Sequence, residues 1–222
     1  MGGSFAGVGG GVNAGRRRRR PAAAARAPEF VAGPSALRYV RAMVTFPNDF
    51  TRASARPTEF LDLSWEMFGE LCRALALKVA RDYEPDLVVG IARAGAIPGA
   101  VVASILRIDF HSMKISRREG DEIVRERPAV LSTAPMQAMG KRVLLVDEIA
   151  SSGETLRMAL AAVRDVRPLE VRTATSFARS RGYKPDYFAL STDATIIYPW
   201  DRKIFEEGEL VVNPRYEDVL DE

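Results

Sequence analysis

The sequence predicts an α/β fold in which helices flank a mostly parallel, twisted sheet of about five strands. Two observations predict it. Short runs of apolar, largely β-branched residues recur along the chain, and segments with helical spacing alternate with them. Two of these runs, residues 87–91 and 143–146, are apolar at every position, as in strands of a parallel sheet that is covered by helices on both faces.

The first predicted helix begins after Ser64, whose hydroxyl can cap the first turn. From Phe68 to Val79, apolar residues recur three and four positions apart. Cys72 lies on this apolar stripe, so we interpret it as a small buried hydrophobe and not as a nucleophile. We interpret Trp65 as a core anchor of the same helix.

Strands and helices then alternate. A strand is predicted over residues 86–91, and the following loop leads to a helix that begins at Pro98, because proline favours the first helical position. The next strand is predicted over residues 107–115, and we interpret His111 within it as structural. The polar residues 116–140 show no clear periodicity, which indicates a mobile functional loop or a hidden hairpin.

The third unit has the clearest pattern. Residues 143–146 form an apolar strand, two acids and a loop follow, and a helix begins after Thr155. Further strands near residues 169–176 and 195–198 complete the predicted sheet.

Charge divides the chain into two parts. Residues 1–42 hold eight arginines and one acid, a balance of +7, so with a net charge of +3 for the whole chain the remaining 180 residues carry −4. This mildly acidic part argues against a nucleic-acid-binding domain. We predict a disordered Arg/Gly/Ala/Pro-rich tail over residues 1–42 and one domain over residues 43–222, with Met43 as an alternative start.

The cysteine and histidine counts and the hydropathy argue against disulfide-linked, zinc-binding and membrane-spanning proteins. The single cysteine and single histidine leave no intramolecular disulfide and no Cys/His zinc site. Every uncharged apolar run is much shorter than a membrane-spanning helix, which needs about 20 residues. We therefore predict a cytoplasmic protein without a membrane or specific nucleic-acid partner.

Asp147 and Glu148 come directly after the strand at residues 143–146. In open parallel sheets, ligands bind beyond the carboxyl ends of the strands. Adjacent carboxylates raise each other's pKa unless they are hydrated, meet a cation or bind a polyol. The next loop, Ser151 to Thr155, offers hydroxyls, a glycine and a helix N-terminus that attracts anions. Together these features predict a site for a ribose 5-phosphate.

Two alternatives are open to this pattern. A capped helix after a strand end needs no ligand at all. A P-loop NTPase also places Asp-Glu after an apolar strand, but it requires G-x-x-x-x-G-K-[ST]. Gly90 and Gly95 have that spacing, whereas Ala96 and Ile97 replace the required Lys and Ser/Thr. The sequence therefore argues against an NTPase.

Residues 143–156 resemble the PRPP-binding signature of type I phosphoribosyltransferases, with four apolar residues, two acids, a spacer and a Ser/Thr-Gly-x-Thr loop. Residues 90–98 resemble the pyrophosphate loop of the xanthine/guanine/hypoxanthine branch, and residues 182–187 and 198–201 resemble its purine-pocket segments. The resemblance covers roughly residues 60–205. It implies the predicted fold with a small C-terminal hood region for the base.

The resemblance also implies a role for each matching residue. Asp147 and Glu148 are the implied catalytic residues and would bind the ribose hydroxyls of PRPP. The implied binding residues are Ser151, Ser152, Gly153, Glu154 and Thr155 for the 5-phosphate, Arg93, Ala94 and Gly95 for pyrophosphate, and Arg179, Ile196, Tyr198, Trp200 and Asp201 for the base. Mg²⁺, bound chiefly through PRPP and assisted by Asp201 through water, is the implied cofactor. Residues 116–134 fall where the family places a closing loop.

Three positions depart from the family pattern. Arg179 replaces a lysine that donates to the base, and Ser151 replaces an aspartate near N7 of the base. Thr195 replaces an aromatic ring, so stacking would fall to Tyr198 or Trp200. The resemblance implies purine salvage, the transfer of the 5-phosphoribosyl group of PRPP to a nucleobase, foremost a 6-oxopurine, by a homo-oligomer. The alternative is a PRPP-sensing regulatory protein with a degenerate base pocket.

Overall fold

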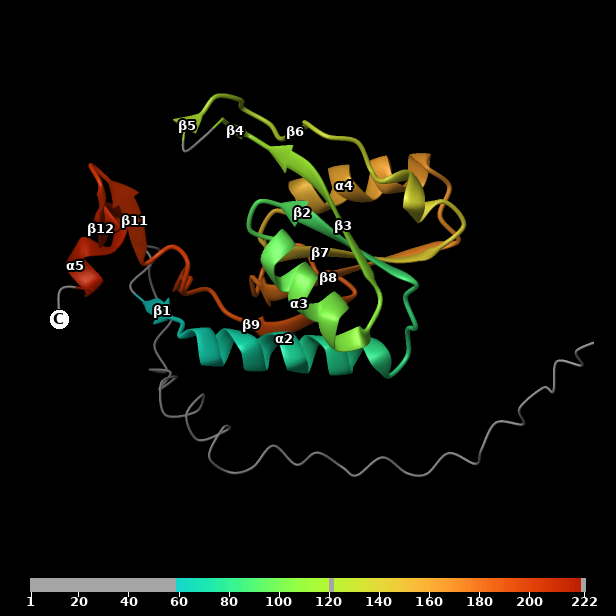
Figure 1. The fold of residues 1–222 in the computed structure, drawn as a ribbon, viewed down its shortest axis with the longest axis horizontal. Coiled ribbons are helices and arrows are strands. Elements are labelled where there is room, and N and C mark those ends of the chain that lie inside the picture. Colours follow the sequence, from blue (N-terminus) through green and yellow to red (C-terminus); the bar gives the residue numbers. More distant parts are fainter. Residues whose placement is uncertain (1–58, 120–121, 221–222) are drawn as a thin grey trace, which may run out of the picture. The chain divides into compact units, whose positions relative to one another are not determined.

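A six-stranded sheet lies at the centre of the computed structural model, which describes residues 59–119 and 122–220. Its order is β6 (Ala129–Val130), β3 (Asp109–Ser116), β2 (Leu87–Ala92), β7 (Arg142–Ala150), β8 (Glu170–Ala178) and β9 (Tyr187–Ser191) (Figure 1). All neighbours pair in parallel except β6, which is antiparallel to β3. The predicted α/β fold with a mostly parallel sheet is confirmed. The predicted tail over residues 1–42 and the alternative start at Met43 lie outside the described residues.

Helices cover both faces of this sheet. In Figure 1, α2 (Trp65–Ala80) and α3 (Ala96–Leu106) lie on one face and α4 (Glu154–Asp165) on the other. The smaller elements are the pairs β1 (Phe60–Asp62) with β10 (Thr195–Ile197), β4 (Arg118–Glu119) with β5 (Glu122–Ile123), and β11 (Lys203–Glu206) with β12 (Glu209–Val212), the 3-10 turns η1 (Met136–Ala138) and η2 (Pro214–Tyr216), and α5 (Glu217–Leu220). No helix in the described ranges is long and apolar enough to cross a bilayer.

The strands are apolar at successive positions because each face packs against a different helix layer. Val88 and Leu144 lie in the core on the α2 and α3 side, and Val89 and Leu145, one position further along the same strands, lie in the core on the α4 side. Register joins the two strands position by position, with Val88 opposite Leu144. A continuous apolar run in the sequence therefore supplies two cores at once.

Helix α2 follows its sequence pattern except at its first residue. The Ser64 hydroxyl accepts from the Met67 N–H at 3.1 Å, as the cap prediction requires. Cys72 is fully buried, and burial raises the pKa of its thiol to about 12, so it is a packed hydrophobe as predicted. The prediction of Trp65 as a core anchor is wrong, because its side chain is 61% exposed. Trp65 precedes the apolar stripe, and its ring packs at the surface beside Trp200.

Several boundaries differ from the prediction. Helix α3 begins at Ala96, so Pro98 is its third residue, where the backbone N–H has no partner within the helix anyway. The strand predicted at residues 195–198 does not join the main sheet. It forms β10, which pairs in parallel with β1. The sheet instead gains β9, which the sequence analysis overlooked because its short run directly follows the turn residues Lys184 to Asp186.

The polar segment over residues 116–140 contains short strands. β4 pairs with β5 in antiparallel fashion, with Arg118 opposite Ile123, and β6 returns to pair with β3. The hidden hairpin is therefore the alternative that the structure supports. His111 lies within β3 opposite Val89, as a strand residue at the predicted position.

Candidate active site

The acid pair, Asp147 and Glu148, lies in β7 just beyond the last residue of this strand that pairs with β2. β2 and β7 pair only as far as Val146, whereas β7 continues beside β8 to Ala150. The predicted strand end at residue 146 is thus the end of one pairing and not the end of the strand. Asp147 and Glu148 follow this point: Asp147 keeps β8 as its neighbour, opposite Thr175, and the end of the β2 pairing leaves a gap in the sheet on the other side of β7.

The loop after β2 fills the space next to this gap. The peptide bond between Ala92 and Arg93 is cis. A Cβ atom on Gly95 would lie 2.7 Å from both Cα and Oδ1 of Asp147. Only glycine therefore allows the backbone of this loop to lie directly against the acid pair.

Asp147 carries the largest electrostatic cost of the site. Its side chain is only 7% exposed, and the Glu148 N–H donates to its Oδ1 at 3.0 Å. Burial raises the pKa of Asp147 well above its ordinary value, and the neighbouring Glu148 charge raises it further. A ligand that donates hydroxyls or brings positive charge would remove this cost.

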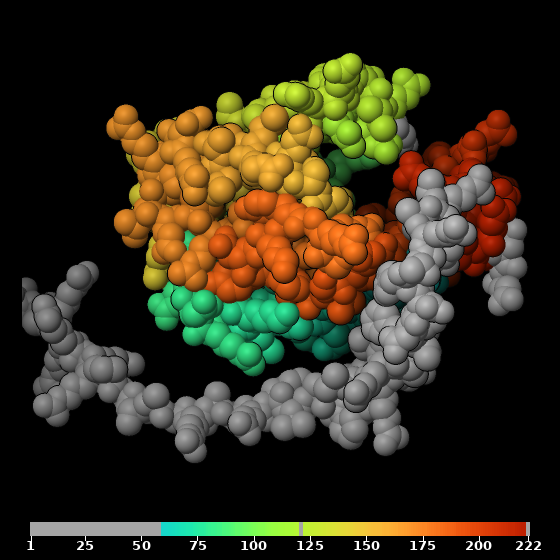
Figure 2. Space-filling view, turned by 180° about the vertical axis from the view of Figure 1, so that it is seen from behind, coloured from blue at the N-terminus to red at the C-terminus, as the bar shows by residue number. Residues whose placement is uncertain are grey.

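A cavity of about 1190 Å³ opens above the acid pair. In the space-filling view, a hollow lies between the yellow-green segment that carries β4 and β5 and the red C-terminal part (Figure 2). The predicted site residues that line the cavity are Arg93, Ala94, Asp147, Glu148, Thr155, Ile196, Tyr198, Trp200 and Asp201. Residues from four separate parts of the sequence thus meet at one place, the carboxyl edge of the sheet.

The predicted residues Ser151, Ser152, Gly153, Glu154, Gly95 and Arg179 are not among the lining residues. Gly95 lies behind the acid pair. Arg179 is the substantive difference, because its guanidinium donates to the carbonyl oxygens of Thr192 and Ala194 at 3.2 and 2.5 Å. These bonds support the turn that leads into β10, and Arg179 is not among the lining residues of the cavity, so its role as a donor to a base stays a prediction.

The loop before α4 has the backbone that its glycine predicts. Gly153 adopts φ +76°, in the left-handed region, and is the residue from which α4 starts. A Cβ atom there would lie 2.3 Å from the Cβ of Tyr183, whose N–H donates to the Ser151 carbonyl at 2.8 Å. The Ser152 hydroxyl accepts from the Glu154 N–H at 3.3 Å. Tyr183 therefore closes the loop from outside, a contact that the sequence did not indicate.

Aromatic rings form the opposite wall. Tyr198 and Trp200 stack at 4.7 Å with an interplanar angle of 15°, and Phe68 meets Trp200 edge-on at 4.9 Å. Burial raises the pKa of Tyr198, and its hydroxyl finds no hydrogen-bond partner among the described residues. Ile196 of β10 is buried beside them. Trp200, which the resemblance gives as a base-binding residue, packs in this wall and also lines the cavity.

Most of the basic side chains that line the cavity were not predicted from the sequence. The additional cations are Lys114, Arg117 and Arg118 at the end of β3 and after it, and Lys203 and Arg215 from the C-terminal part. With Arg93 they place six basic side chains against three acidic ones, which favours a polyanionic ligand. The pair Arg117-Arg118 directly after a strand was a readable signal. Arg215 gave none, because only the return of the chain brings it there.

The acidic side chains fit a magnesium ion that is held mainly by its ligand. Asp147, Glu148 and Asp201 line the cavity and offer the oxygen atoms that hard cations prefer. Within residues 59–119 and 122–220, no three His, Cys, Asp or Glu side chains gather closely enough to hold a metal by themselves. Mg²⁺ commonly binds through one or two carboxylates, waters and substrate phosphates, so this donor set suits a metal that arrives with a phosphorylated substrate.

Comparisons with known proteins point to one family. The profile of the phosphoribosyl transferase domain matches residues 63–210. Xanthine-guanine phosphoribosyltransferase of Nitratidesulfovibrio vulgaris (strain Hildenborough) is 29% identical over 160 residues, which cover 69% of this chain and 91% of the relative. The protein of the same name from Ruegeria sp. (strain TM1040) is 31% identical over 153 residues, covering 63% and 84%.

A solved structure agrees with these relatives. The purine phosphoribosyltransferase from Pyrococcus horikoshii superimposes with a TM-score of 0.57 at 26% identity and covers 68% of this chain and 99% of that chain. Because the family profile spans most of the described residues, including the acid pair and the loops around it, the chain belongs to the phosphoribosyl transferase domain family.

Proposed function

We propose that this protein transfers the 5-phosphoribosyl group of PRPP to a purine base and releases pyrophosphate. The observation that carries the proposal is the meeting of Asp147, Glu148 and Arg93 at one cavity, together with relatives named for purine substrates. The PRPP-sensing regulator is not favoured, since those relatives are named as enzymes.

Asp147 and Glu148 bind the ribose hydroxyls in this proposal. The two ribose hydroxyls donate hydrogen bonds that offset the free-energy cost of the Asp147 charge, which is buried and poorly hydrated. When the bond between C1 and pyrophosphate breaks, positive charge develops on the sugar ring. The same two carboxylates then stabilise that charge more strongly in the transition state than in the ground state.

Arg93 and the backbone of Ala94 and Gly95 hold the leaving pyrophosphate. Arg93 lines the cavity, and the packing of Gly95 against Asp147 keeps this loop within reach of the sugar. Mg²⁺, when bound with PRPP, supplies positive charge that neutralises the leaving group. Asp201 assists the hydrated ion. Lys114 and Arg117 line the same cavity and add to its positive potential.

The 5-phosphate binds at the loop from Ser151 to Thr155. The positive φ of Gly153 turns the chain so that α4, a 12-residue helix, starts there, and its first N–H groups attract an anion. Of this loop, Thr155 lines the cavity, and the other loop residues would contribute the main-chain N–H groups at the start of α4. The segment with β4 and β5 would close over PRPP and exclude water.

The purine base lies against the wall of Tyr198, Trp200 and Ile196. These residues line the cavity, and the stacked pair Tyr198 and Trp200 offers the aromatic surface that Thr195 lacks. Both bonds of Arg179 to carbonyl oxygens use Nη1, so donation to the base oxygen by this residue would use its Nε or Nη2. The cytoplasmic location and the homo-oligomeric state stay predictions.

The test is a panel of bases mixed with the full chain, PRPP and Mg²⁺, with release of pyrophosphate and the nucleotide product both measured. We expect turnover with xanthine, guanine or hypoxanthine and none with uracil. The double variant Asp147→Asn, Glu148→Gln serves as the matched inactive control. Folded protein that produces no nucleotide from any purine would overturn the proposal.

A further inference from the structure

Asp201 is the acidic residue of the cavity that lies furthest along the chain. It follows β10 and comes directly before the hairpin of β11 and β12, and it lines the same cavity as Asp147 and Glu148. Unlike those two, it does not sit on the main sheet. Its position therefore depends on the contacts that its own carboxylate and backbone make.

Two residues from beyond the hairpin hold this carboxylate. The Tyr216 hydroxyl donates to Oδ2 of Asp201 at 2.9 Å. The Asn213 side-chain amide donates to Oδ1 at 3.3 Å and to the main-chain oxygen of Asp201 at 2.9 Å. Each carboxylate oxygen accepts one of these bonds and keeps a further lone pair for another donor, such as a metal-bound water.

The chain returns to Asp201 through the hairpin. Lys203 lies opposite Val212, and the Asn213 N–H donates to the Arg202 carbonyl at 2.9 Å, which closes the base of the hairpin. The hairpin itself is mostly exposed, with Phe205 at 74%. Asn213 and Tyr216, by contrast, are only 9% and 5% exposed. The ordered contacts are thus concentrated where the chain comes back to the cavity.

A second contact fixes the other side of the same turn. Arg202 forms two bonds with the Asp62 carboxylate, at 3.0 and 2.8 Å, and Asp62 belongs to β1, which pairs with β10. Asp201 is therefore flanked by one anchored neighbour and by two direct donors. Asn213 and Tyr216 line the same cavity, so the support for Asp201 comes from the cavity wall itself, where contacts of this kind hold a functional side chain in one rotamer.

We propose that Asn213 and Tyr216 are positioning residues for Asp201, so that the C-terminal turn completes the active site. The inference rests on the proposed function, in which Asp201 assists a magnesium ion bound with PRPP. A misplacement of about 1 Å in a catalytic constellation can cost about 10²-fold in rate, so two donors on one carboxylate are a substantial constraint.

The first test is calorimetric titration of PRPP into the full chain, with Mg²⁺ and separately with EDTA. In Tyr216→Phe we expect the affinity measured with Mg²⁺ to fall about tenfold, the value of one hydrogen bond to a charged group, while the affinity in EDTA stays within about twofold. A residue that only stabilised the fold would lower both affinities or neither. Equal affinities of variant and wild type with Mg²⁺, or a parallel loss in EDTA, would overturn the inference.

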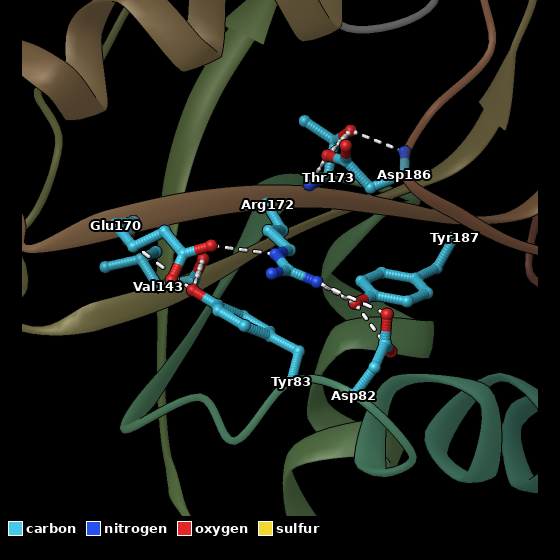
Figure 3. A network of polar contacts seen from close by, with 8 residues as sticks. All are labelled: Asp82, Tyr83, Val143, Glu170, Arg172, Thr173, Asp186 and Tyr187. Atoms are coloured by element: carbon cyan, nitrogen blue, oxygen red, sulfur yellow. Dashed lines mark hydrogen bonds and ion pairs between the residues drawn. The ribbon is translucent and has the colours of Figure 1, made fainter.

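The molecule supplies a matched control. Tyr187 also donates its hydroxyl to an aspartate, Oδ1 of Asp82 at 3.0 Å, but outside the cavity (Figure 3). Tyr187→Phe should leave both PRPP affinities unchanged. A loss like that of Tyr216→Phe would show that removal of any tyrosine–aspartate bond has this effect, and would contradict positioning.

Two further variants keep the outcome decisive. Asp201→Asn alone should lower the affinity with Mg²⁺, and adding Tyr216→Phe should change it no further, because the tyrosine acts only through the aspartate. Additive losses would sink the inference. Asn213→Ser removes the amide donor without adding a charge and keeps a side-chain oxygen that can accept from the Arg215 N–H, so it tests the same role if Tyr216→Phe does not fold.

Failure of the two proposals is distinguishable. If the wild type binds PRPP with Mg²⁺ and forms nucleotide while Tyr216→Phe matches it, the positioning role is wrong and the proposed function stands. If the wild type neither binds PRPP nor releases pyrophosphate, the proposed function fails and takes the positioning role with it.

Discussion

Two groups of polar side chains in this protein differ in how completely the protein satisfies them. The first surrounds Arg172, outside the cavity, and the second is the acid pair at the carboxyl edge of the sheet. In the first, the Arg172 guanidinium bonds to Glu170 at 2.8 Å and to the Tyr187 hydroxyl at 2.6 Å (Figure 3). Tyr187 in turn donates to Asp82, so donors and acceptors match one another.

Rings and main-chain groups complete the Arg172 network. Arg172 lies 4.6 Å from the centroid of the Tyr83 ring, and the Tyr83 hydroxyl donates to the Val143 carbonyl at 3.0 Å. Nearby, Asp186 accepts from both the N–H and the hydroxyl of Thr173. The network joins the end of α2 to β7, β8 and β9, which is a structural role that needs no ligand.

The acid pair has its bonds chiefly within itself. Asp147 accepts the N–H of Glu148 at 3.0 Å and shares a side-chain hydrogen bond with Glu148, while burial and the Glu148 charge raise the pKa of its carboxyl. Charged side chains alone therefore do not indicate a ligand-binding site. A buried acid whose charge the protein does not neutralise does indicate one, because a bound ligand can offset the free-energy cost of burying that charge.

The largest effect should come from neutralising the acid pair. In Asp147→Asn with Glu148→Gln, side-chain volume is nearly unchanged while the charge next to the developing cation disappears. We expect turnover to fall by about 10²-fold or more. Pyrophosphate release with the best base of the panel measures it. Wild-type turnover in the double variant would show that the unsatisfied acids are not the reactive ones.

The phosphate loop should give the next largest effect. Gly153→Ala imposes a Cβ at φ +76° that also overlaps Tyr183 at 2.3 Å, so the loop must move. We expect about a tenfold loss of PRPP affinity, the equivalent of about 1.4 kcal/mol. Calorimetry with Mg²⁺ measures it.

Gly140→Ala is the control for this variant. Gly140 also adopts a positive φ, +67°, but nothing lies within 4 Å of the added atom. Its backbone strain is comparable, so stability should fall while PRPP affinity stays. If both variants lost PRPP affinity equally, general strain rather than the shape of the phosphate loop would be the cause.

Neutralising one acid in each region should change the stability of the folded protein in opposite directions. The pKa of Asp147 is raised in the folded protein, so its folded state favours the protonated form, and wild-type stability falls as the pH rises above about 4. Asp147→Asn should therefore melt about 2–4 °C higher than the wild type at pH 7, which corresponds to about 1 kcal/mol. The difference should vanish near pH 4.

Asp186→Asn makes the same change in a satisfied acid. Asp186 accepts from Thr173 at 2.7 and 2.8 Å, so loss of its charge weakens existing bonds and should lower the melting temperature at pH 7. Thermal melting of both variants from pH 4 to pH 8 checks the pair. Stabilisation by both changes would contradict the distinction between the two regions.

The smallest effect belongs to the Arg172 network. Tyr83→Phe removes the bond from its hydroxyl to the Val143 carbonyl and keeps the ring beside Arg172. We expect the free energy of unfolding to fall by about 1 kcal/mol. Denaturant unfolding measures it, and turnover of the folded enzyme should be unchanged. A loss of turnover at full folding would show that the network also supports the site.

Local patterns predicted the parts of the fold and site that depend on neighbours in sequence. Periodicity predicted the helix that begins after Ser64, and the apolar run ending at Val146 predicted the first half of β7, the strand in which the acid pair lies. The glycine at position 153 predicted a positive φ, because no other residue type adopts that conformation freely. In each case the interactions that decide the outcome lie within a few residues of the position.

Long-range contacts decided the rest. Nothing near Arg179 in the sequence indicates that its guanidinium donates to the carbonyls of Thr192 and Ala194. Likewise, nothing near Tyr216 indicates that its hydroxyl donates to Asp201. The folded chain also pairs β10 with β1 instead of with the sheet. Which donor meets which acceptor depends on the path of the whole chain, because such partners are joined by packing between elements and not by spacing along the sequence. The order of residues along the chain is enough to predict an acidic pair followed by a loop of Ser, Gly and Thr, because these features are local. Only the packing of distant elements brings the other side chains around them.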